Sequence, residues 1–298
     1  MGIDIFVLIQ DSIDLSIVLV IASMGGLLQM RSGIVNIAIE GQIVIGALAG
    51  FAVSSLFSNY VLGLIAAILF GALSGILFSS IILFFGANQI LVGLGFNVLV
   101  IGAIGYVLKS VLGVSGTLSS QSVEQIPRFF PVPDSWPKPV QVLFNGHDVL
   151  YYVALFLLVS VTILLRHSRI GLRLQAVGYS EFVAIQVGLK ATQIKLLIGA
   201  VSGALIGLAG AELSLGQVGL FNLQMVAGRG FISLAAFYFG RIKPIPTALA
   251  CLLFAFFDAF QVQLQLMDFS ANLVSTLPYL MVVVALSLSQ IFSRLRKV

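Results

Sequence analysis

The segment Arg31-Ser-Gly-Ile-Val-Asn-Ile-Ala-Ile-Glu-Gly-Gln42 places an amide and a carboxyl group in a stretch that is otherwise apolar enough for a lipid bilayer. An ionisable side chain costs free energy there, so Asn36 and Glu40 are candidate functional residues. Residues four positions apart share one face of a helix, and this spacing predicts that both side chains face the same space. Gly33 and Gly41 allow the helix to start late, to bend, or to let another backbone approach closely. The alternative role is packing, in which a protonated Glu40 hydrogen-bonds a neighbouring helix.

The composition of the whole chain is that of a polytopic membrane protein. Of the 298 residues, 59% are hydrophobic and 9% are charged, and the mean hydropathy is +1.13. These values exclude an ordinary soluble domain. Apolar runs recur along the chain, each near the roughly 20 residues that cross the hydrocarbon core as a helix. The sequence therefore predicts an all-α fold, a transmembrane helical bundle that forms a single domain over residues 1–298.

Hydropathy predicts about nine spans, within a range of eight to ten. They cover residues 12–29, 34–54, 61–85, 89–110, 149–165, 196–215, 226–240, 246–265 and 273–291. Residues 226–240 are short for a full crossing and contain Gly228-Arg229-Gly230, so we expect a broken or re-entrant helix there. Glycines recur at every fourth position in two spans, at 71 and 75 and at 199, 203 and 207, which predicts close helix packing.

The charges between the spans predict an orientation. The stretch 166–195 carries Arg166, Arg169, Arg173, Lys190 and Lys195 against a single glutamate, and the positive-inside rule places it in the cytoplasm. The basic C-terminus is expected on the same side. The acidic N-terminus and the proline-rich loop 112–148 are expected outside. Because the N-terminus lacks the basic region of a cleaved signal peptide, the first span is expected to remain in the mature protein.

The sequence shows no motif for catalysis, metal binding or nucleotide binding. His147 and His167 lie in no metal-ligand spacing and are expected at the surface, and the single Cys251 excludes an intrachain disulfide. No phosphate-binding G-x-x-x-x-G-K-[ST] loop is present, so any ATP hydrolysis must come from another subunit. We expect this chain to have no enzyme activity, no metal site and no bound cofactor. Its basic residues cluster at span ends, so no nucleic-acid partner is expected.

The predicted cytoplasmic stretch contains a short helix that ends at a glycine, Gly178-Tyr-Ser-Glu-Phe-Val-Ala-Ile-Gln-Val-Gly188. A small helix framed by basic turns is suited to docking into a groove on a partner protein. The alternative is an ordinary helix at the membrane interface.

The stretch from Arg173 to Gly188 resembles the coupling loop of membrane permeases of ABC importers, in the branched-chain amino acid, ribose and nucleoside group. Its Ala184-x-x-x-Gly188 element is similar to the core of the family's EAA-type loop, although Val183 stands where the family often has a second alanine. Three further blocks, 33–42, 87–97 and 227–241, resemble the family in the same order. The versions at 40–42 and 228–231 look most similar to nucleoside permeases. Riboflavin and simple-sugar permeases share much of the pattern.

The resemblance implies a multi-pass transport subunit of the cell (inner) membrane. It implies a translocation pathway shared with a second permease subunit, either a sister permease or a second copy. It also implies a cytoplasmic ATP-binding subunit that uses ATP and Mg, and an extracytoplasmic substrate-binding lipoprotein or protein. Gly178, Glu181, Ala184 and Gly188 would form the element that couples to the ATPase. The alternative from another class is a proton-coupled secondary transporter with Glu40 as the proton carrier.

Polar side chains within or near apolar helices are candidates for a pathway, because they offer hydrogen bonds to a polar solute. The pathway candidates are Asn36, Glu40, Gln42, Gln89 and Asn97. Asp258, Gln261 and Gln265 share one face of a later span and are candidates for an external vestibule, or equally for hydrogen bonds between helices. Glu212 and Arg229 are expected to pair across the mouth and to hold the broken helix in place.

Overall fold

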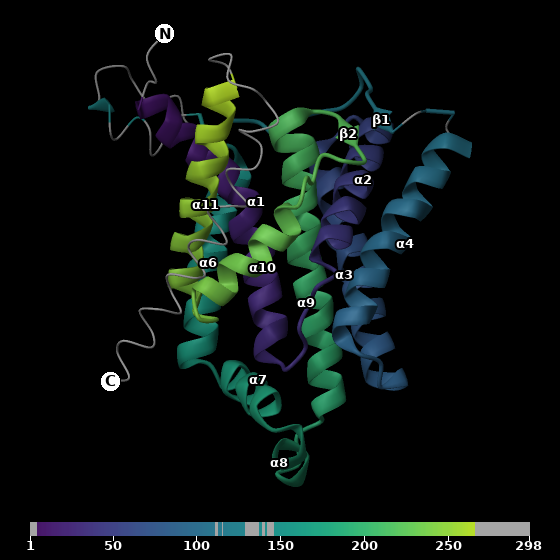
Figure 1. The fold of residues 1–298 in the computed structure, drawn as a ribbon, viewed down its shortest axis with the longest axis vertical. Helices are drawn as coiled ribbons and strands as arrows, with labels where there is room; N and C mark the ends of the chain where they lie inside the picture. The colour runs from purple at the N-terminus through teal and green to yellow at the C-terminus, as the bar shows by residue number, and fades with distance from the viewer. Residues whose placement is uncertain are drawn as a thin grey trace.

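The computed structural model describes residues 5–110, 113–114, 116–128, 137–138, 141 and 146–265. These residues form a helical bundle with one two-stranded sheet. Seven of the described helical segments are long and apolar enough to cross a membrane, and in Figure 1 they run along the long axis of the molecule. They are α1 (Ile5–Arg31), α2 (Ile39–Phe57), α3 (Tyr60–Phe85), α4 (Gln89–Ser110), α6 (Val149–His167), α9 (Ala191–Ala211) continued by the π-helix η1 (Glu212–Val218), and α11 (Pro244–Gln265). The polytopic all-α fold is confirmed.

Two of the predicted spans are not among these seven. The predicted span 226–240 corresponds to α10 (Arg229–Phe239), a helix of 11 residues, which is about 16 Å long and too short to cross the hydrocarbon core. The predicted span 273–291 lies outside the described residues. A broken helix at 226–240 was therefore the correct expectation, whereas nine full crossings are not confirmed.

Polar caps and left-handed residues set the ends of the helices. The side chain of Asn59 accepts hydrogen bonds from the amides of Val61 and Leu62 at the start of α3, and Gly86, with φ +61°, ends the same helix. Serine side chains cap the two short helices α7 (Arg169–Tyr179) and α8 (Glu181–Gln186). Both lie at the lower end of the bundle in Figure 1, so the chain between α6 and α9 folds as a compact unit at one end of the bundle.

Glycines bring α9 into backbone contact with its neighbours. A β-carbon at Gly71 of α3 would collide with the carbonyl oxygen of Gly203, and one at Gly75 would collide with that of Gly199. On the α2 side, a β-carbon at Gly46 would collide with the backbone of Gly207. The four-residue glycine spacing therefore has the predicted effect, and α9 is the central helix around which α2 and α3 pack.

Two helices begin inside the bundle rather than at its end. The sequence predicted a span over residues 34–54, and the helix α2 of this span begins late, at Ile39. Gly33 has φ +89°, and the side-chain oxygen of Asn36 accepts a hydrogen bond from the amide of Ala38 at 2.9 Å, a local turn that competes with the helix. The second such helix is α10, which follows Gly228 at φ +81°.

The end of the bundle opposite α7 and α8 is covered by part of the loop 112–148. Its strand β1 (Thr117–Leu118) pairs antiparallel with β2 (Phe221–Asn222), which leads into α10. The hydroxyl of Ser54 in α2 donates to the carbonyl of Glu124 at 3.0 Å. Both strands lie at the upper end in Figure 1. The described part of this loop is thus attached to the spanning helices.

Candidate functional site

The carboxylate of Glu40 joins the two helices that begin inside the bundle. Glu40 lies in the first turn of α2, and its two oxygens accept hydrogen bonds from the amides of Gly228 and Gly230, both at 2.8 Å. The first amides of a helix have no partner within the helix and carry partial positive charge, so a carboxylate is a favourable partner for them. Glu40 is 9% exposed, and it anchors the N-terminus of α10 against α2.

Gly230 allows this close approach. A β-carbon at this position would lie 2.5 Å from the backbone nitrogen of Glu40 and 2.6 Å from its α-carbon. Backbone atoms of a packed helix cannot turn aside as a flexible side chain can. The small residue and the carboxylate therefore belong to one structural unit.

An amide network lies beside this unit. The Nδ2 of Asn36 donates to the side-chain oxygens of Gln29 at 2.8 Å and Gln42 at 2.9 Å, and the Nε2 of Gln29 donates to the hydroxyl of Ser79 at 3.0 Å. All four side chains are buried. The network ties the extended segment 34–37 to α1, α2 and α3. Because Asn36 precedes α2, the predicted helical i, i+4 relation between Asn36 and Glu40 is wrong.

Two side-chain amides of α4, those of Gln89 and Asn97, hold the same extended segment. The side-chain oxygen of Gln89 accepts from the amide of Val35 at 2.7 Å. Asn97 accepts from the amide of Gly41 at 2.8 Å and donates to the carbonyl of Ile37 at 2.9 Å. The structure thus gathers all five pathway candidates around residues 33–42. Most of their polar atoms bond to the backbone and to one another and so fix the shape of this region, whereas the Nε2 of Gln42 is buried with no hydrogen-bond partner among the described residues.

The three vestibule candidates lie on α11, and one of them contacts the start of α10. Asp258 lies 3.5 Å from the guanidinium of Arg229, which also donates to the carbonyl of Met225. Gln261 is partly buried and Gln265 is exposed on the same helix. The predicted pair between Arg229 and Glu212 is wrong, because α11 supplies the acidic partner of Arg229.

Sequence reasoning missed a second buried polar cluster, around Glu212 in the π-helix η1. Glu212 is 1% exposed, and a β-carbon at Gly216 would collide with a carboxylate oxygen of Glu212 and closely approach one of Asp148. His147, expected at the surface, is 1% exposed, and its Nδ1 lies 2.6 Å from a carboxylate oxygen of Asp14. The cluster joins α1, the start of α6 and η1. Two acidic residues inside predicted spans, Asp14 and Glu212, were the signal that could have identified it.

The predicted coupling element is formed by α8 and its flanking residues. Ala184 is 2% exposed and packs with Val177 and Ala191, while Glu181 accepts a hydrogen bond from Lys195 at 2.6 Å. Gly188 has φ +82° and ends the helix, as its position in the sequence predicted. The outer side of α8 exposes large apolar side chains, including Phe182 at 74% and Ile185 at 53%, and Val187 directly after the helix is 69% exposed. Such a surface is typical of a site that another protein covers.

The last residues of α7 contact the chain just before the extended segment 34–37. A β-carbon at Gly178 would collide with the carbonyl oxygen of Arg31 and approach the amide of Gly33 at 3.1 Å. The guanidinium of Arg31 in turn donates to the carbonyl of Ile242 at 2.6 Å and 3.1 Å. The unit that carries α8 is therefore in backbone contact with the segment that leads to Glu40.

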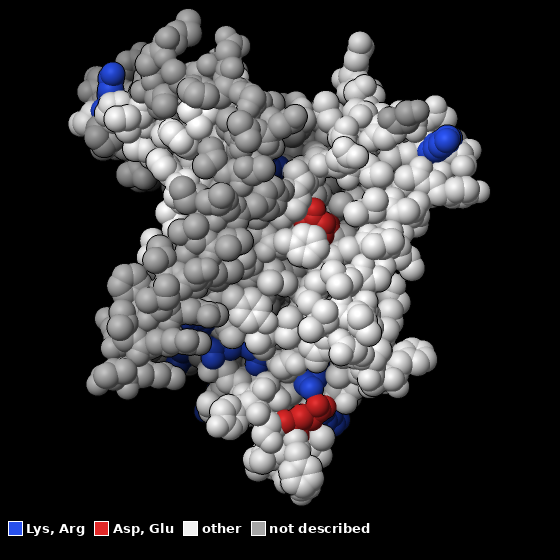
Figure 2. Space-filling view, in the orientation of Figure 1, with Lys and Arg blue, Asp and Glu red and all other residues white. Residues whose placement is uncertain are grey.

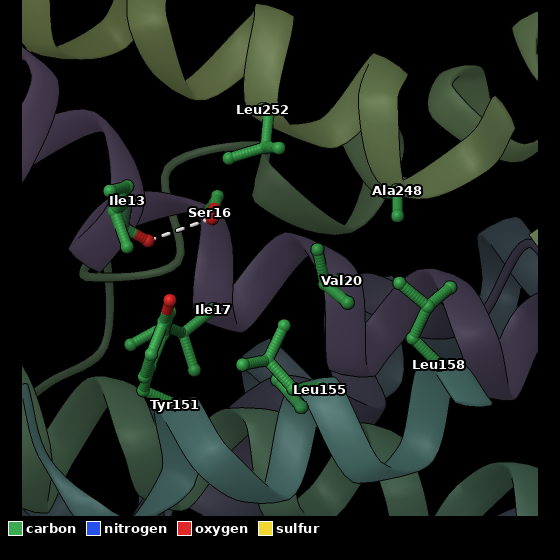
Figure 3. A pocket seen from close by; sticks show the side chains of 10 residues that line it. Ile13, Ser16, Ile17, Val20, Tyr151, Leu155, Leu158, Ala248 and Leu252 are labelled. Carbon is green, nitrogen blue, oxygen red and sulfur yellow. Dashed lines mark hydrogen bonds between the residues drawn. The ribbon is translucent and has the colours of Figure 1, made fainter. Parts of the chain in front are cut away.

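An apolar cavity of about 150 Å³ lies between α1, α6 and α11. Figure 3 shows Ile17, Val20, Leu155 and Leu252 pointing into it, and the hydroxyl of Ser16 engaged with the carbonyl of Ile13. Few polar atoms are left to hydrogen-bond a solute here. This cavity is therefore a poor site for a polar ligand, and the region around Glu40 remains the candidate site.

Helices that begin inside a membrane bundle, as α2 and α10 do, with their N-termini facing a buried polar centre, are characteristic of membrane transport proteins. Comparison with protein families gives the specific class. The pattern described as "Branched-chain amino acid transport system / permease component" matches residues 8–286. The chain therefore belongs to this permease family.

Named relatives extend over most of the chain. The nucleoside ABC transporter permease protein NupC of Lactococcus lactis is 30% identical over 95% of this chain and 92% of its own length. The guanosine ABC transporter permease protein NupQ of Bacillus subtilis is 27% identical over 90% of this chain and 87% of its own length. The putative glucose ABC transporter permease protein TsgC13 of Haloferax volcanii is 28% identical over 87% of this chain and 78% of its own length. No solved structure matches the chain.

Proposed function

We propose that this chain is the transmembrane permease subunit of an ATP-driven ABC importer for a nucleoside-like solute. The solute class is supported by NupC and NupQ, whose names specify nucleosides and guanosine and whose similarity covers at least 90% of this chain. The structural observation that carries the importer mechanism is the backbone contact of Gly178 with Arg31 and Gly33. This contact links the exposed helix α8, through α7, to the extended segment that leads to Glu40.

The exposed apolar side of α8 is the proposed docking site for the ATP-binding subunit, which uses ATP and Mg. Phe182, Val183 and Ile185 are each more than half exposed, and burying such side chains in a partner's groove is favourable. Movement of α8 reaches the pathway because α7 contacts the backbone at Arg31. This chain then contributes the pathway, and the partner contributes the hydrolysis.

We place the solute along the face where the N-termini of α2 and α10 meet. Phe231 is 43% exposed at the start of α10, and its ring can stack on a nucleobase. Ile37 is partly exposed and Ala227 is exposed beside the same breaks. In this arrangement Asn36, Glu40, Gln42, Gln89 and Asn97 form and brace the wall of the pathway. A second permease subunit, a sister permease or a second copy, completes it.

The proposed orientation places α7 and α8 in the cytoplasm. Figure 2 shows Lys and Arg side chains gathered over this lower part of the molecule, as the positive-inside rule requires. The opposite end, with β1, β2 and the described part of the loop 112–148, then faces the substrate-binding lipoprotein or protein. The start of α1 also lies outside in this orientation. The C-terminus, expected inside, is not among the described residues.

Reconstituted uptake tests this proposal. The chain would be co-purified with its ATP-binding and second permease subunits, placed in liposomes, and supplied with binding protein and radiolabelled guanosine, cytidine, ribose, glucose or riboflavin. We expect uptake of the nucleosides that requires MgATP on the ATPase side. Uptake driven by a proton gradient without the ATPase would overturn the importer mechanism. ATP-driven uptake of only glucose, ribose or riboflavin would overturn the solute class.

A glycine pair tests the docking role of α8. Gly188 and Gly86 both have positive φ, and a β-carbon added at either position would have no atom within 4 Å, so a leucine strains the backbone at both sites without a steric clash. We expect Gly188→Leu to leave the subunit inserted but to remove most ATPase co-purification and uptake. Gly86→Leu should retain both. Equal ATPase binding by the two variants would contradict the docking site.

A further inference from the structure

A cavity beside the coupling element combines basic and apolar walls. It has a volume of about 460 Å³ and lies between α7 and the first turns of α9. Arg173 and Lys190 line it, and Ile170, Leu189 and Leu197 form much of its apolar surface. This composition differs from that of the cavity in Figure 3, which has no charged lining residue. The basic cavity therefore offers a site for a ligand that has both an anionic and an apolar part.

The two basic residues are available to an anion. Arg173 and Lys190 are exposed, and neither forms an ion pair with any residue that the structure describes. The nearby acidic residue Glu181 is engaged by Lys195 at 2.6 Å. A guanidinium and an ammonium group together suit a phosphate, since the first binds it through several donors and the second acts as a compact charge.

The apolar wall continues from these charges along a spanning helix. α9 begins at Ala191, and Leu197 lies about 9 Å further along the helix axis at 1.5 Å per residue. Leu197 is 64% exposed and Ile170 is 60% exposed. An amphiphile at this position can keep its charged group beside Arg173 and Lys190 at the membrane surface. Its chain then extends along Leu197 toward the hydrocarbon core.

We infer that this cavity binds an anionic phospholipid, with its phosphate on Arg173 and Lys190 and one acyl chain along Ile194 and Leu197. The occupant is a membrane lipid rather than free phosphate because the apolar wall needs a hydrocarbon partner. Gly188, which ends α8, also lines the cavity. The bound lipid therefore contacts the coupling element, and its headgroup supports the position of α8. Only the choice of the cytoplasmic leaflet rests on the proposed function.

Lipid retention measured by native mass spectrometry tests the site. The subunit complex would be purified from nanodiscs of phosphatidylcholine with or without phosphatidylglycerol. We compare Arg173→Gln/Lys190→Gln with a control, Arg166→Gln/Lys243→Gln, which removes two exposed basic residues near the same end of the bundle and outside the cavity. We expect the first variant to bind phosphatidylglycerol at least roughly ten-fold more weakly, because each basic residue near an anionic lipid contributes about a factor of five.

Three outcomes would overturn the inference. One is unchanged phosphatidylglycerol retention in Arg173→Gln/Lys190→Gln, and another is an equal loss in the control, which would show a general charge effect. The third is displacement of the lipid by millimolar inorganic phosphate, which would assign the site to a free anion. A further variant, Leu197→Asn, should weaken lipid retention without changing the two charges. The readout is binding, so the result does not depend on which solute is transported.

Discussion

Glu40 and Glu212 are both carboxyl groups buried in the helical bundle, but their partners differ. Glu40 accepts hydrogen bonds from the amides of Gly228 and Gly230, whereas a carboxylate oxygen of Glu212 lies with one of Asp148 beside Gly216. The first arrangement requires two acceptor oxygens. The second brings two acidic groups close together inside the bundle, and two adjacent buried negative charges are costly. A buried glutamate in a span thus identifies a polar centre, and its partners decide what the side chain does there.

The largest effect is expected from Glu40→Ala. This substitution leaves two amides at the start of α10 without an acceptor, and each unsatisfied buried donor costs about 1–3 kcal/mol. We expect a clear loss of thermal stability in detergent and loss of most ATP-driven uptake. Glu40→Gln keeps one acceptor oxygen and should fall between Glu40→Ala and wild type. Wild-type stability and uptake in Glu40→Ala would show that the carboxylate does not hold α10.

A smaller but distinct effect is expected from Gly230→Ala. The added methyl group would meet the backbone of Glu40 at 2.5 Å, and overpacking of this kind costs about 1–3 kcal/mol. The control is Gly95→Ala in α4, where no atom lies within 4 Å of the new carbon. Thermal unfolding should separate the two variants, with only Gly230→Ala lowering the midpoint. An equal response would contradict the close contact between α2 and α10.

The smallest effect is expected from Glu212→Gln. A glutamine keeps the size of the side chain, carries no negative charge and can donate to a carboxylate oxygen of Asp148, so we expect a change in unfolding free energy within about 1 kcal/mol. Asp148→Asn should behave in the same way as long as its oxygen still accepts from the amide of Tyr151. The measurement is thermal unfolding beside Glu40→Gln. A loss as large as that of Glu40→Gln would remove the distinction between the two carboxyl groups.

Much of the fold was predictable because hydropathy and small-residue spacing act locally. The bounds of α4 agree with the predicted span 89–110, and the glycines of α3 and α9 meet as their spacing indicated. The shortness of α10 was also visible from Gly228 and Gly230. These features depend on one helix face or one run of residues, and one sequence contains that information.

The details of the site were less predictable because they depend on contacts between distant segments. Asn36 was assigned to a helix, yet its own side chain and Gly33 favour a turn there. The partner of Arg229 is Asp258 rather than Glu212, a choice made by the packing of α11. His147 is polar and lies near the end of the proline-rich loop 112–148, so its contact with Asp14 could not be read from its neighbours in the chain. The candidate residues were found, but their hydrogen-bond partners required the structure.

The strand pair β1–β2 connects α10 to the end of the bundle opposite α7 and α8. β2 ends at Asn222, and only residues 223–228 separate it from the helix whose first amides bind Glu40. A protein that docks on the loop around β1 could therefore shift α10 through this short connecting segment. At the opposite end of the bundle, Gly178 of α7 contacts the backbone at Arg31, which precedes the segment that leads to Glu40. In the proposed importer, partners bound at the two ends of the bundle would thus act on the same pair of helices, α2 and α10.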